Sequence, residues 1–97
     1  MISVESLIKK QPFKGLTLEK IASQNSFEIL TITLEKDAIF PEHTSPKDAV
    51  LLLLEGQIEF HINNENHKLD TQQHMRFPKE TIHWVKAHQN SKFLIIR

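Results

Sequence analysis

The stretch at residues 41–56, PEHTSPKDAVLLLLEG, decides the fold of this chain. It begins with a proline that is followed closely by His43, passes through a polar turn, and continues as an unbroken apolar run at 50–54. A short apolar run between turn residues is typical of a strand buried in a sheet. A second fragment, FPKETIH at residues 77–83, ends another strand at a proline and leads to His83. The two fragments predict a protein built from short strands.

Alternating apolar and polar residues predict further strands on both sides of this stretch. In residues 27–35, Leu30, Ile32 and Leu34 alternate with threonines, whereas the opposite phase of the residues before them predicts a bulge or a change of face near 29–30. The other expected strands lie at residues 57–63, 73–77, 83–87 and 93–96, with a weaker start at 13–18, and turns fall at 23–26, 35–37, 63–66 and 90–91. Many short strands with almost no helix predict an all-β sandwich or barrel.

The N-terminal segment has a different pattern. Val4, Leu7 and Ile8 are spaced as on one face of a helix, Ser3 is a candidate N-cap, and Pro12 stops the pattern. We therefore expect a short helix or turn over residues 3–10. The whole chain of 97 residues is expected to form one domain. Residues 27–97 would form its core, and residues 1–26 would pack outside.

Composition excludes several classes of function. Twelve basic and twelve acidic residues give a formal net charge of zero, so no basic patch is available for nucleic acid. The absence of cysteine excludes disulfides, thiolate catalysis and zinc–thiolate sites. No signal peptide and no apolar run long enough to span a bilayer is visible, so we expect a cytoplasmic protein without membrane contact. Six histidines invite a test for metal binding.

The order of these features resembles the small single-domain cupins of the cupin 2 type. Their first motif has the form G-x5-H-x-H-x3,4-E-x6-G, in which His43 and Gly56 fit. Their second motif has the form G-x5-P-x-G-x2-H-x3-N, in which Pro78 and His83 fit. The resemblance covers residues 30–96. It implies a jelly-roll β-barrel, usually a dimer, with a cavity near one mouth.

The resemblance also implies a metal, but the ligand set is degenerate. In metal-binding members, two histidines and a glutamate of the first motif join the histidine of the second to hold Fe, Mn, Ni or Zn. Here the second histidine falls on Ser45 and the glutamate on Ala49. In the second motif, Gln72 and Glu80 stand at the glycines and Ala87 at the asparagine. Because two imidazoles are too few for a tight site, we expect no firmly held metal, and a weakly held divalent ion on His43 and His83 is the alternative.

The other four histidines are predicted to lie at the surface. His61 and His74 are out of phase with their apolar neighbours, so they should face solvent or a subunit contact. His67 and His88 fall at turns. Asp48 also faces away, because strand parity puts its neighbour Ala49 on the cavity side.

Side-chain direction predicts an apolar pocket with polar groups at its mouth. His43, His83 and Ser45 should converge on the mouth. The apolar lining is predicted to be Ala49, Leu51, Leu53, Ile58, Phe60, Met75, Phe77 and Val85. Two alternatives remain open from the sequence. The inward side chains can instead fill the barrel, and the two histidines can instead be hydrogen-bonded structural residues.

The opposite face of the central strand is apolar as well. Val50, Leu52 and Leu54 need cover, either from the N-terminal segment or from another subunit. Trp84, on the outward face of its own strand, can join such a contact. These residues predict a symmetric homodimer.

Two functions remain open, and no catalytic residue is assigned. The first is a metal-free protein that binds a small, partly apolar molecule, with an anionic group on the ligand met by protonated His43 or His83. The alternative is a cupin enzyme, either a metal-dependent dioxygenase or isomerase using the same histidines or a metal-free acid–base catalyst. A third possibility is a structural or regulatory partner protein that contacts its partner through Trp84 and the apolar row Val50, Leu52 and Leu54.

Overall fold

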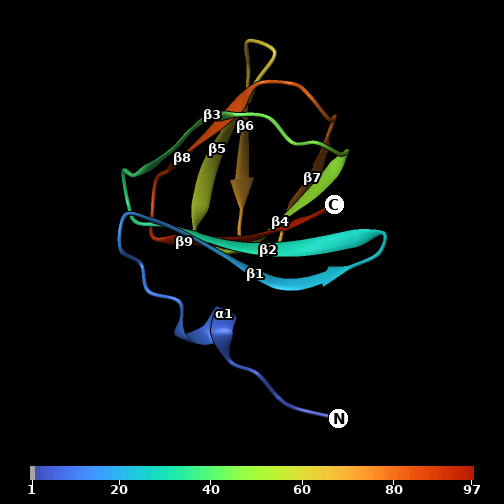
Figure 1. Ribbon diagram of the computed structural model, residues 1–97. Helices are drawn as coiled ribbons and strands as arrows, with labels where there is room; N and C mark the ends of the chain where they lie inside the picture. The colour runs from blue at the N-terminus through green and yellow to red at the C-terminus, as the bar shows by residue number, and fades with distance from the viewer. Residues whose placement is uncertain (1) are drawn as a thin grey trace.

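The computed structural model describes residues 2–97 as two antiparallel sheets preceded by one helical turn (Figure 1). The fold class is all-β, which confirms the prediction made from the alternating segments. The elements are α1 Leu7–Lys10, β1 Leu16–Gln24, β2 Phe27–Leu34, β3 Ile39–His43, β4 Ala49–Glu55, β5 Gln57–Ile62, β6 Glu65–Asp70, β7 His74–Phe77, β8 His83–Ala87 and β9 Ser91–Ile96.

The strand order is that of a jelly roll. One sheet runs β1-β2-β9-β4-β7 and the other runs β3-β8-β5-β6, so the chain crosses repeatedly from one sheet to the other. β1 is the additional strand, paired with β2 at the edge of the first sheet. The segment 1–26, expected to pack outside, therefore contributes a strand to the barrel, and of its described residues those at 2–15 precede that strand.

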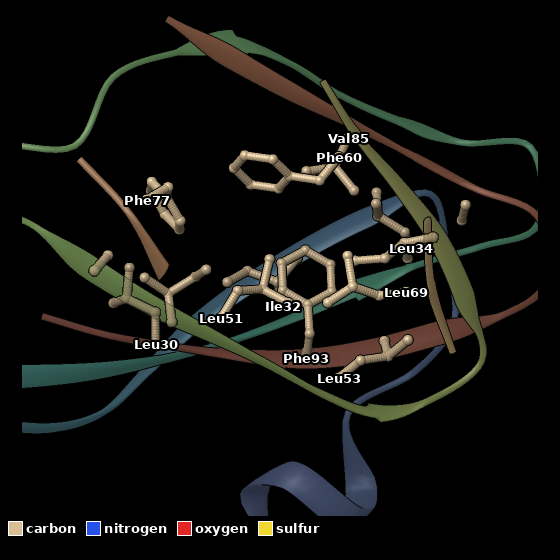
Figure 2. Packing of buried hydrophobic residues seen from close by; sticks show 14 of the residues in the cluster. Leu30, Ile32, Leu34, Leu51, Leu53, Phe60, Leu69, Phe77, Val85 and Phe93 are labelled. Carbon is tan, nitrogen blue, oxygen red and sulfur yellow. The ribbon is translucent and has the colours of Figure 1, made fainter. Parts of the chain in front are cut away.

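Alternation along the strands builds the core between the two sheets. On β4, Ala49, Leu51 and Leu53 are buried, whereas the residues between them are half-buried on the outer face. Figure 2 shows inward side chains from both sheets meeting between them, among them Phe60 and Phe93. Each fully buried aliphatic or aromatic side chain stabilises the fold by about 1.5–3 kcal/mol.

The irregularity predicted near residues 29–30 lies on the neighbouring strand. β2 pairs with β9 in one continuous register, but the register of β1 shifts between Lys20 and Ala22, which lie opposite Leu30 and Ile29. The β1–β2 ladder thus absorbs one extra residue at this point. The bulge lies in edge strand β1, so it leaves the pairing of β2 with β9 unbroken.

Two strands, β3 and β6, are not predicted by the sequence pattern. β3 contains Pro41, which can occupy a strand only at an edge, and β3 is indeed the edge of the second sheet. β6 exposes every residue except Leu69, so it has no alternating apolar signal. Both are edge strands, and edges require little apolar surface.

The expected N-terminal helix over residues 3–10 is wrong in extent. Only α1 is helical, Ser6 rather than Ser3 precedes it, and the Ser6 side chain makes no capping hydrogen bond. Val4 is 96% exposed, so it does not contribute to a packed helical face. A single turn without tertiary packing has little intrinsic stability. In Figure 1 the chain before α1 extends away from the barrel.

Polar contacts made by α1 and by the residues just after it hold the N-terminal segment on the outer face of the larger sheet. Gln11 donates from Nε2 to the carbonyl oxygen of Thr31 at 3.1 Å and accepts from Thr31 Oγ1 at 2.8 Å. Thr33 donates to the carbonyl oxygen of Pro12 at 2.8 Å. Lys92 donates to the carbonyl oxygen of Ile8 at 2.5 Å. Gln11 and both threonines are buried, so these contacts cover the centre of the sheet.

Replacing Gly56 is predicted to destabilise the fold strongly. Gly56 has φ +99°, and a Cβ there would lie 2.6 Å from the carbonyl oxygen of Asn90 and 2.7 Å from Ser91 Cα. Gly56→Ala should therefore cost about 2–4 kcal/mol, through backbone strain plus overlap, measured by urea unfolding. Gly15→Ala is the matched control, because Gly15 has φ +62° but an added Cβ meets nothing within 4 Å. Equal losses in the two variants would contradict the role of overlap.

The outer apolar row of β4 is the surface on which we propose a homodimer. Val50, Leu52 and Leu54 remain half-buried, as do Leu94 and Ile96 of neighbouring β9. Light scattering at tens of micromolar, roughly the range in which a dimer with micromolar Kd is populated, should give twice the chain mass. Leu52→Glu should give the monomer, whereas Glu19→Gln on edge strand β1 should leave the dimer intact. A monomeric parent protein at this concentration would rule the interface out.

Candidate functional site

The pairing of β3 with β8 brings the two predicted histidines together at one mouth of the barrel. His43 lies directly opposite His83 in the ladder, and their ring centroids are 4.1 Å apart in an edge-to-face arrangement. His83 is 2% exposed, whereas His43 is half-buried. The two motifs, far apart in the sequence, therefore meet at this point in the structure.

A bulge in β3 determines which way His43 points. Phe40 pairs with Val85 and His43 pairs with His83, so three steps along β3 match two steps along β8. In a regular strand, residues three apart face opposite sides of the sheet. The extra residue in β3 turns Phe40 and His43 toward the same side of the sheet. Their rings therefore stack, with centroids 4.0 Å apart.

Each imidazole is held by a hydrogen bond to a backbone carbonyl two residues before it. His43 Nδ1 lies 2.7 Å from the oxygen of Pro41, and His83 Nδ1 lies 2.9 Å from the oxygen of Thr81. Because a carbonyl oxygen can only accept, both Nδ1 atoms carry the proton. In the neutral ring, Nε2 is then left as a hydrogen-bond acceptor or a metal ligand.

Aromatic rings continue from the histidines into the core. Phe60 stacks on His83 at a centroid distance of 5.1 Å, and Phe77 lies 4.7 Å from His83 and 5.0 Å from Phe60. With Phe40 at the rim, these residues form a continuous aromatic column, defined here as Phe40, His43, His83, Phe60 and Phe77. Ring contacts of this kind hold each side chain in one orientation.

Burial lowers the pKa of His83 below its ordinary value, and electrostatic repulsion between a protonated His83 and the neighbouring His43 and Arg97 lowers it further. The hydrogen bond to the Thr81 carbonyl acts in the opposite direction. The balance keeps the His83 ring neutral near pH 7, because burial disfavours the charged form.

Ser45 makes its contacts with a residue that the sequence patterns did not identify. Ser45 is 2% exposed; its Oγ donates to the carbonyl oxygen of Lys47 at 2.7 Å and accepts from Arg97 Nη1 at 3.3 Å. Arg97 also donates from Nε to Glu28 Oε1 at 2.7 Å. Arg97 belongs to neither motif, and its approach to Ser45 depends on the pairing of β2 with β9, which the sequence does not specify.

The apolar residues predicted to line the pocket all face the barrel interior. Met75 packs against the buried core, and the others belong to it: Ala49, Leu51, Leu53, Ile58, Phe60, Phe77 and Val85. Their direction agrees with strand parity (Figure 2). Whether they bind a ligand stays a prediction.

The side chains at this mouth do not fit the metal that the resemblance implies. Ala49 and Ser45 provide no carboxylate and no imidazole, so two Nε2 atoms remain as donors. Across residues 2–97, no three His, Cys, Asp or Glu side chains are grouped so that they could hold a metal ion. A firmly bound divalent ion normally needs three or four such donors.

The other four histidines divide into two pairs. His67 and His74 are exposed, as expected. His61 and His88 are half-buried on the outer face of the second sheet, where both face the carboxylate of Glu59. Strand parity correctly places His61 outside the barrel, and His88 lies in the turn after β8 as predicted, but neither pattern reveals this cluster.

Comparison with known proteins agrees with this architecture. A conserved protein of unknown function from Streptococcus pyogenes superimposes with a TM-score of 0.81 at 20% identity, over 99% of this chain and 86% of the other. A cupin superfamily protein from Desulfitobacterium hafniense gives 0.84 at 15% identity, over 99% and 90%. An RmlC-like cupin from Desulfovibrio desulfuricans gives 0.85 at 20% identity, over 99% and 95%. At these identities the likeness concerns the fold alone.

No curated protein matches the sequence. Among residues 2–97, no helix has the length and apolar character needed to cross a membrane. The family model of the cupin domain, however, matches residues 30–96. The match covers both motifs, the histidine pair and eight of the strands, β2 in part. Because it covers more than half of the sequence, this chain belongs to the cupin family.

Proposed function

We propose that this cupin binds a small, partly apolar molecule at the mouth of its barrel through His43 and His83, without a tightly held metal. The observation that carries the proposal is the pair of imidazoles, 4.1 Å apart, whose Nδ1 atoms are both occupied by backbone carbonyls. Two oriented polar groups beside an apolar surface are the usual form of a small-molecule site.

The protonation of the pair supports a particular kind of ligand. A neutral His83 with its Nδ1–H already bonded offers Nε2 only as an acceptor. The ligand should therefore donate a hydrogen bond, as a hydroxyl or an amide does, while its apolar part contacts the Phe40 ring. The lowered pKa of His83 makes an anionic group less favourable at this residue than the sequence suggests.

The alternative is a metal-dependent dioxygenase or isomerase that uses the same histidines. The geometry favours it in one respect, because both Nε2 atoms are available as ligands. It lacks the further donors that such a centre needs, since Ser45 and Ala49 replace them. We therefore favour binding without metal.

Binding is testable by thermal unfolding of chelator-treated protein against a set of small phenols, alcohols and amides. At 100 times its Kd, a ligand stabilises the native state by about 2.7 kcal/mol, so the melting temperature should rise by several degrees. His43→Ala should abolish the increase, whereas His74→Ala, at an exposed position on β7, should retain it. Stabilisation that appears only after Fe, Mn, Ni or Zn is added would favour the enzyme, and no stabilisation by any compound would refute the proposal.

The neutral state of His83 predicts a dependence of stability on pH. Because its folded pKa lies below the unfolded value near 6.5, the unfolded state binds more protons in the interval between the two values. The free energy of unfolding should therefore be highest above pH 6.5 and fall as the pH is lowered through that interval. The loss is about 1.4 kcal/mol for each unit by which the pKa is lowered.

Urea unfolding at pH 7.5, 6.5 and 5.5 measures this effect. His83→Phe preserves the aromatic contacts with Phe60 and Phe77 but cannot titrate, so its stability should vary less over this range. His74→Ala is the control, and it should behave as the parent does. An identical pH dependence in His83→Phe and the parent would contradict a neutral, buried His83.

A further inference from the structure

A second concave surface lies outside the barrel, on the outer face of the smaller sheet. It is a groove with a volume of about 690 Å³ between the β5–β6 hairpin and the loop before β8. Trp84 and His61 line it together with Glu42, Asn63, Asn66 and Glu80. His61 and Trp84 are paired across β5 and β8, opposite in direction to the inward Phe60 and Val85. The groove is therefore separate from the histidine pair in the barrel mouth.

The aromatic part of the groove is flat and firmly held. The rings of His61 and Trp84 are stacked, with centroids 3.7 Å apart and planes 2° from parallel. Glu59 Oε1 accepts a hydrogen bond from Asn66 Nδ2 at 2.6 Å, and His61 Nε2 lies 3.3 Å from the same oxygen without forming a hydrogen bond. The second carboxylate oxygen of Glu59 contacts His88. Because stacking restrains the His61 and Trp84 rings before any ligand arrives, binding needs less ordering of these side chains.

The walls of the groove carry amides and carboxylates. Asn63 and Asn64 form the tip of the hairpin, with φ 52° and 60°, the turn that the sequence predicts there. Within residues 2–97, Glu42 and Glu80 have no basic side chain in ion-pair distance, and the lining contains neither lysine nor arginine. The walls therefore offer neutral donors and many acceptors, with a local negative potential.

We propose that this groove binds a neutral polyhydroxylated ring, that is, a sugar. A hydroxyl group both donates and accepts, which matches asparagine amides beside carboxylate acceptors. The apolar C–H face of a sugar ring can pack against a fixed aromatic face such as Trp84. The unpaired Glu42 and Glu80 should repel uronic acids and sugar phosphates, so the site should select for neutral ligands.

The chain contains a single tryptophan, so its fluorescence reports directly on this groove. We suggest titration with glucose, galactose, mannose, N-acetylglucosamine, maltose and cellobiose. At least one should give a saturable change in emission with a Kd of about 0.1–10 mM, typical of a shallow polar site. Glucuronate and glucose 6-phosphate should bind about tenfold more weakly or not at all.

Variants identify the residues that carry the effect. Glu42→Ala combined with Glu80→Ala should weaken sugar binding about tenfold or more, since two acceptors are lost. Glu19→Ala, an exposed carboxylate on distant β1, should leave binding unchanged. Trp84→Leu should abolish binding when it is followed by sugar-proton saturation transfer, which needs no tryptophan. The double glutamate variant keeps the test valid if Trp84→Leu fails to fold.

Three results would overturn the proposal. The first is the absence of a saturable response to every neutral sugar. The second is a stronger response to choline than to any sugar, which would identify the groove as a site for organic cations. The third is equal binding of glucuronate and glucose, because the unpaired carboxylates would then have no effect on selection.

Discussion

The bulged pairing of β3 with β8 is the contact on which the mouth of the barrel depends. It places His43 opposite His83 and, by adding one residue to β3, turns Phe40 and His43 toward the same side. Without the added residue, strand parity would point one of these two rings away from the barrel. The aromatic column and the orientation of both imidazoles follow from this local irregularity, which lies in an edge strand where the sheet can accommodate it.

Sequence reasoning succeeds where burial alone determines the pattern. The run at 50–54 locates β4, alternation gives the bounds of β8, and the two motifs place His43 beside His83. It fails at β3 and β6, because edge strands require few apolar residues. It also missed Arg97 and the cluster around Glu59, because both depend on contacts between strands whose pairing no short stretch of sequence specifies.

Ser45 and Ala49, which stand at two positions where the resemblance implies metal ligands, are accommodated without a cation. Ala49 joins the buried core, and Ser45 satisfies its hydroxyl with the Lys47 carbonyl and the Arg97 guanidinium. A buried carboxylate at position 49 would be costly without a cation to neutralise it. The carboxylate of Glu59, by contrast, lies on the outer face of the second sheet. A hydrogen bond from Asn66, and then the nearby His88 and His61, lower its pKa and so stabilise its charged form.

The position of β9 has a consequence for synthesis. It is the last strand along the chain but lies in the middle of its sheet, between β2 and β4, and its Lys92 anchors the carbonyl of Ile8. On the ribosome, β2 and β4 must therefore wait with unpaired edges until residues 91–96 have emerged from the exit tunnel. Until then the unpaired edges of β2 and β4 are open to wrong pairing and aggregation, from which chaperones can protect the nascent chain.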